Sequence, residues 1–140
     1  MKKNIILALI FNLFIISTFF AQNIKSPSEF LGYELGSRFT RHHKVVEYFM
    51  YISKQSSNVI LEKYGETNEF RPLYLSYISS EENLSNIENI RLANLNRTGI
   101  LKNAINSDVV ITWLSYNVHG NEASSTEAAM LTIYKLITEK

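Results

Sequence analysis

The chain has 140 residues, of which 46% are hydrophobic, with 14 lysines and arginines, 13 aspartates and glutamates and no cysteine. This length and apolar content suit one small globular domain and exclude an intrinsically disordered chain. A formal net charge of +1 gives no electrostatic reason to expect nucleic acid as a partner. The lack of cysteine excludes a disulfide framework, a cysteine-ligated zinc site and a thiol nucleophile.

The first 21 residues have the order of an export signal. Lys2 and Lys3 precede a largely apolar run over residues 5–20, and Ala21 supplies a small residue at its end. The run is short for a bilayer-spanning helix, which needs about 20 apolar residues. We therefore expect residues 1–21 to be a cleaved signal peptide, with an uncleaved anchor as the alternative. The product is expected to be periplasmic or extracellular, without a stable membrane anchor.

Residues 22–39 contain proline, glycine and serine, and this composition predicts a turn-rich segment. Thr40 is expected to cap the helix that follows it. The apolar residues of that helix recur at i, i+3, i+4 and i+7, and they are Val45, Tyr48, Phe49 and Ile52. The helix should end near residues 56–57.

The middle of the chain predicts an antiparallel hairpin. Residues 59–64 and 73–78 have strand character, and the segment between them is polar. Pro72 cannot donate to a sheet ladder, so we expect it at the start of the second strand. Ser80 and the acidic residues after it then predict the start of a helix that runs to about residues 98–99.

Two further elements are expected near the C-terminus. Residues 109–114 are almost continuously apolar, which predicts a strand covered on both faces. Ser124 and Glu127 have the spacing of a capping box at the start of a last helix. The apolar stripe of that helix is Met130, Ile133, Tyr134 and Ile137. The order of all these elements predicts an α/β sandwich.

His119 and Glu122 form the strongest candidate site, because they lie between the expected buried strand and the last helix. Ligands collect at the carboxyl ends of strands in open α/β sheets. A neutral imidazole and a carboxylate are both good zinc ligands, and Gly120 allows the turn between them. The alternative is structural: a loop histidine and a glutamate that serves only the helix start.

Several segments of the sequence resemble those of the zinc carboxypeptidases, the carboxypeptidase A-like metallopeptidases. Residues 115–127, SYNVHGNEASSTE, are similar to the first metal-ligand segment of that family. Residues 26–36, SPSEFLGYELG, look like the start of exported bacterial members. Residues 64–67 and 71–73 are similar to their early hairpin, although Phe70 stands where members often have glycine. The resemblance covers essentially residues 26–140.

The resemblance implies that His119 and Glu122 are two of the three protein ligands of one zinc ion. It implies that residues 40–140 are the N-terminal portion of the catalytic domain, an incomplete α/β/α sandwich with a mixed sheet. The third ligand, the general base and the arginine that holds the substrate carboxylate would lie beyond Lys140, so no catalytic residue is expected within this chain. The last helix has no glycine or proline stop, and we expect a truncated and inactive fragment.

The expected function is therefore that of a zinc metallocarboxypeptidase acting on a peptide or protein substrate. One alternative is a deacylase or amidohydrolase of the same fold, and another is a metal-free secreted binding module. His42 and His43 are adjacent on a helix and are expected to be solvated or half-buried rather than ligands. A serine hydrolase is disfavoured, because capping explains Ser124 and the single aspartate, Asp108, precedes the expected strand at its opposite end.

Overall fold

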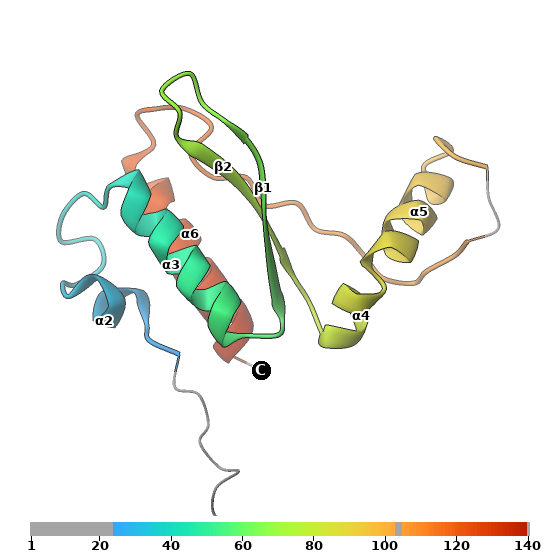
Figure 1. Cartoon of the computed structure of the whole chain (residues 1–140), viewed down its shortest axis with the longest axis horizontal. Coiled ribbons are helices and arrows are strands. Elements are labelled where there is room, and N and C mark those ends of the chain that lie inside the picture. The colour runs from blue at the N-terminus through green and yellow to red at the C-terminus, as the bar shows by residue number, and fades with distance from the viewer. Residues whose placement is uncertain (1–23, 103–104, 140) are drawn as a thin grey trace, which may run out of the picture.

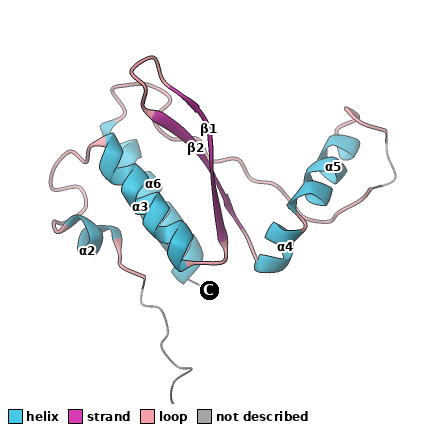
Figure 2. Cartoon of the chain, in the orientation of Figure 1, coloured by secondary structure: helices cyan, strands magenta, loops and turns pink. Residues whose placement is uncertain are grey.

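The computed structural model describes residues 24–102 and 105–139, so the expected signal peptide at residues 1–21 lies outside the described residues. Within these residues, helices combine with one two-stranded antiparallel sheet, which agrees with the α/β class (Figure 1, Figure 2). The elements in chain order are α2 (Pro27–Leu31), α3 (His42–Gln55), β1 (Val59–Glu66), β2 (Pro72–Ile78), α4 (Glu81–Ser85), α5 (Ile87–Arg97) and α6 (Ala123–Thr138). None of the helices within the described residues is long and apolar enough to cross a membrane.

Helices α3 and α6 pack on the hairpin and form the core with it. Helix α3 contacts α6 and β1, and α6 also contacts β2 (Figure 1). The buried residues that meet between them are Tyr48, Ile52, Val59, Met130 and Ile133. Each helix contributes residues three or four positions apart, because these lie on one helical face. The apolar stripes predicted for both helices are confirmed.

The predicted hairpin is confirmed, including the position of its proline. Val59 pairs with Ile78 at one end of the ladder, and Glu66 pairs with Pro72 at the other. Pro72 begins β2, where its missing N–H removes little from the ladder. An irregularity between Lys63 and Gly65 interrupts the register on β1.

Phe70, in the hairpin loop, has a left-handed backbone with φ of 61°. Its side chain is 82% exposed, so no packing within the described residues offsets the steric cost of this conformation. Glycine adopts positive φ without the steric penalty that a Cβ brings.

The single helix expected after Ser80 is instead two helices. Its predicted start is confirmed, because the Ser80 hydroxyl accepts a hydrogen bond of 3.2 Å from the N–H of Asn83. Asn86 then leaves the helical conformation with φ of −107° and ψ of 16°, and it separates α4 from α5. Its side-chain oxygen accepts a hydrogen bond of 2.6 Å from Asn89. Asparagine has a lower helix propensity than alanine or leucine, and the apolar pattern does not report this difference.

The prediction of a strand at residues 109–114 is wrong for the described structure. The segment is not part of a sheet, and Val110 and Trp113 are 78% and 72% exposed. An apolar run becomes a strand only when a neighbouring strand completes its backbone hydrogen bonds and covers its faces. The two described strands pair with each other and not with this segment.

Trp113 is the single tryptophan of the chain, so its fluorescence reports on this segment alone. We expect a red-shifted emission that iodide quenches efficiently, because the indole is 72% exposed. Truncation to alanine should change the free energy of unfolding by no more than about 0.5 kcal/mol, as for other exposed positions. A blue-shifted, unquenched emission would contradict the described placement of this residue.

The caps predicted for α3 and α6 are wrong, and Thr40 and Glu127 form a tertiary contact instead. Helix α3 has Arg41 at its N-cap and α6 has Glu122, and neither side chain caps its own helix. Thr40 is fully buried and donates a hydrogen bond of 2.6 Å to Oε1 of Glu127. Oε2 of Glu127 accepts a bond of 2.5 Å from the N–H of Gly36. We call Thr40, Gly36 and Glu127 the carboxylate clasp, which ties the N-terminal segment to α6.

Candidate metal site

The site loop, residues 115–122, leads directly into α6. The Tyr116 hydroxyl donates a hydrogen bond of 2.9 Å to the hydroxyl of Thr132, two turns into that helix. Asn117 follows with a left-handed φ of 55°, which turns the chain at the start of the site. The loop is therefore attached to α6 before it reaches the candidate ligands.

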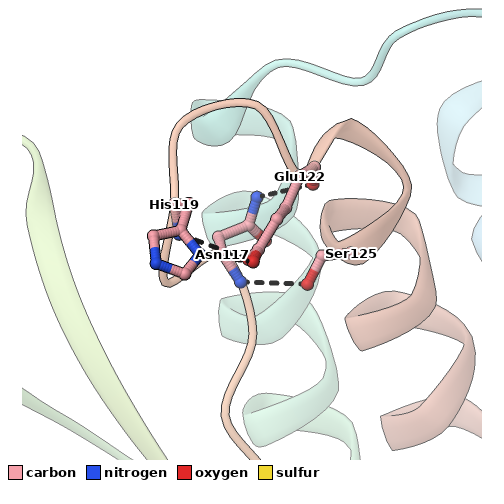
Figure 3. Close-up of polar contacts among 4 residues, drawn as sticks. All are labelled: Asn117, His119, Glu122 and Ser125. Atoms are coloured by element: carbon pink, nitrogen blue, oxygen red, sulfur yellow. Dashed lines mark hydrogen bonds and ion pairs between the residues drawn. The ribbon is translucent and has the colours of Figure 1, made fainter.

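The structure brings His119 and Glu122 together (Figure 3). Nδ1 of His119 lies 2.8 Å from Oε1 of Glu122. The backbone N–H of His119 donates to Oε2 of Glu122 at 3.2 Å, and the N–H of Glu122 donates to the carbonyl of His119 at 3.2 Å. The two side chains are thus hydrogen-bonded to each other, and a metal ion shared between them stays a prediction.

Glu122 is held in its ionised form by its neighbours. The hydrogen bond from the His119 side chain lowers the pKa of the Glu122 carboxyl below its usual value, and the backbone N–H of His119 lowers this pKa further. Glu122 is also the N-cap residue of α6, where the helix dipole favours negative charge. A carboxylate that is ionised at neutral pH is in the state that binds a cation.

The pair fits a zinc ion after a small adjustment. Zinc bonds of about 2.1 Å at a tetrahedral angle separate a nitrogen and an oxygen ligand by about 3.4 Å. The observed separation of Nδ1 and Oε1 is 2.8 Å, so the pair must open by about 0.6 Å and Nδ1 must carry no proton. The side chains of His119 and Glu122 are 72% and 37% exposed, which leaves room for that movement and for further ligands.

A complete metal site is not assembled in the described part of the chain. Within residues 24–102 and 105–139, no group of three or more His, Cys, Asp or Glu side chains is placed to hold a metal ion. His42 and His43 are exposed at the start of α3, as predicted for residues outside the site. Ser124 is exposed, and the Ser125 hydroxyl accepts a hydrogen bond of 2.9 Å from the backbone N–H of Asn117.

Sequence reasoning missed the residues that support the loop. The backbone N–H of Asn117 donates to the Ser125 hydroxyl at 2.9 Å (Figure 3). The Asn117 side chain donates to the Thr126 hydroxyl at 2.7 Å. The sequence feature that could have indicated this support is Asn117, two positions before His119. Asparagine adopts the left-handed conformation more readily than most residues, so it often marks a turn.

No family model, no curated protein and no solved structure matches this chain. The assignment of His119 and Glu122 as a candidate metal site therefore rests on the geometry of the pair and on the resemblance of the surrounding residues.

Proposed function

We propose that this chain belongs to a zinc-dependent metallopeptidase and supplies two of its metal ligands, His119 and Glu122. The observation that carries the proposal is the separation of 2.8 Å between Nδ1 of His119 and Oε1 of Glu122. A backbone hydrogen bond of 3.2 Å from the N–H of Glu122 to the carbonyl of His119 closes the turn that holds the two side chains at this separation. The proposed activity is removal of C-terminal residues from peptides, which follows from the resemblance to the zinc carboxypeptidases.

The proposed fold is an incomplete α/β/α sandwich, of which the described residues form one part. Packing of α3 and α6 against the hairpin supports one helix-on-sheet layer of such a fold. The exposed apolar segment at residues 109–114 has the composition of an inner strand.

A bound zinc ion would lower the pKa of its water towards neutrality and polarise the scissile carbonyl. His119 would bind it through Nδ1, the nitrogen that faces Glu122, and Glu122 would bind it as an ionised carboxylate. The two ligands supply one negative charge, which offsets part of the charge of the ion. The resemblance places the third ligand and the general base on residues that follow Lys140.

The test uses the protein translated from the whole reading frame that contains this chain. We expect it to release C-terminal residues from peptides with a free carboxylate and to leave amidated peptides uncut. The variants H119A and E122A should each lose at least about 100-fold in kcat/KM, because a lost metal ligand costs more than a lost supporting residue. The matched control is H43A, which removes an exposed histidine on α3 and should retain full activity.

Full activity in H119A or E122A would reject the assignment. Equal cleavage of free and blocked substrates would indicate the deacylase or amidohydrolase alternative. A protein without hydrolytic activity and without bound zinc would indicate the secreted binding module.

A further inference from the structure

Asn117 is hydrogen-bonded to three residues at the start of α6, which are Glu122, Ser125 and Thr126. We infer that Asn117 is a positioning residue, which holds His119 and Glu122 in the converging arrangement that a metal ion requires. The inference rests on the proposed metal site, and it assigns a role to a residue that contributes no ligand atom.

The backbone of Asn117 sets the direction of the loop. Its φ of 55° is left-handed, and Phe70 is the other non-glycine residue with positive φ in the described structure. Asparagine tolerates this region better than most residues, because its short polar side chain forms local hydrogen bonds. The turn directs the following residues back over the first turn of α6, where Glu122 lies (Figure 3).

The side chain of Asn117 then fixes that direction. Its Nδ2 donates to the Thr126 hydroxyl at 2.7 Å and to the backbone carbonyl of Glu122 at 3.3 Å. A carbonyl oxygen only accepts, so the amide nitrogen must face α6 and the orientation of the amide is determined. Thr126 is 7% exposed and therefore gives the amide a rigid anchor.

These contacts act on both ends of the turn that carries the ligands. Asn117 lies two residues before His119, and its amide holds the carbonyl of Glu122 itself. Its backbone N–H is bonded to Ser125 at 2.9 Å, three residues beyond Glu122. The turn from residue 117 to residue 122 is thus closed by Asn117 at its base and by the His119–Glu122 pair at its tip. Loss of the Asn117 hydrogen bonds should leave His119 and Glu122 free to separate.

The experiment is a zinc titration of the 140-residue chain, followed through the imidazole NMR signals of His119. The variant N117G keeps the left-handed conformation and removes the amide, so it isolates the side-chain contacts. We expect its zinc affinity to fall about 10-fold, the lower end of the range for residues that orient metal ligands. N117D keeps the size of the side chain, but it cannot donate to the Glu122 carbonyl and should behave like N117G.

A second readout does not depend on the metal. In zinc-free protein, the imidazole nitrogen shifts should show the hydrogen bond at Nδ1 in the wild type and its weakening in N117G. The matched control is N121G, which changes an exposed asparagine in the same turn and should retain both properties. A merely structural role would lower the melting temperature of N117G and leave the zinc affinity and the nitrogen shifts unchanged.

The outcomes separate this inference from the proposed function. Wild-type zinc affinity in N117G, with binding lost in H119A, would overturn the role of Asn117 and leave the metal site standing. Wild-type affinity in H119A would overturn the metal site itself. If N117G does not fold, S125A decides the question, because it removes the acceptor of the Asn117 N–H. An unchanged zinc affinity in S125A would then overturn the inference.

Discussion

Replacing Glu127 with alanine is expected to destabilise the fold by about 3–6 kcal/mol, because its two hydrogen bonds to a charged group contribute about 1.5–3 kcal/mol each. Glu127 is 8% exposed, and its carboxylate accepts from the N–H of Gly36 and the hydroxyl of Thr40. The alanine variant leaves both donors without their acceptor. The Tyr33 hydroxyl lies 2.8 Å from the Thr40 hydroxyl, so the disturbance extends into the N-terminal segment.

Chemical denaturation followed by circular dichroism measures this change in the free energy of unfolding. The matched control is E139A at the end of α6, where the carboxylate is 65% exposed and lies 3.8 Å from Lys135. An exposed ion pair of this kind contributes between about 0 and 1 kcal/mol. Equal stability losses in E127A and E139A would show that the carboxylate clasp does not hold α6 to the N-terminal segment.

The second large effect is expected in zinc affinity. H119A and E122A should each weaken zinc binding by at least about 100-fold, since loss of a ligand exceeds the effect of losing a supporting residue. If both groups bind one ion, loss of either removes the chelate. The double variant should therefore bind zinc about as weakly as either single variant. The changes in binding free energy in this double-mutant cycle should then be strongly non-additive. Calorimetric titration or NMR measures all four affinities.

The control for this cycle is H43A, which should bind zinc as the wild type does. Its side chain is exposed on α3, and histidine is a common adventitious zinc ligand. Additive losses in the double variant would mean that His119 and Glu122 bind zinc independently, and the shared site would be rejected.

The sequence predicted the elements whose pattern is local. The apolar stripe that contains Tyr48 and Ile52 marks α3, and the stripe that contains Met130 and Ile133 marks α6, because helical periodicity alone places them on one face. The polar turn and Pro72 marked the hairpin for the same reason. The His119–Glu122 hydrogen bond agrees with the expectation that three-residue spacing in a turn brings two side chains together, and the shared metal ion stays a prediction.

The failures came where a distant residue decides the outcome. Glu127 has the spacing of a capping residue, but Thr40 and Gly36 lie 87 and 91 positions earlier in the sequence and take both its oxygens. The run at residues 109–114 has the composition of a buried strand, and composition does not supply the neighbour that a strand needs. Asn117 was missed because its role lies in contacts to α6 that no sequence motif records.

Anomalous diffraction at the zinc absorption edge tests the central claim most directly, on crystals of this chain soaked with zinc. The account predicts one peak at about 2.1 Å from both Nδ1 of His119 and a carboxylate oxygen of Glu122. It also predicts that the separation of those two atoms increases from 2.8 Å when the ion enters. An anomalous peak at another position, with the His119–Glu122 hydrogen bond intact, would contradict the account.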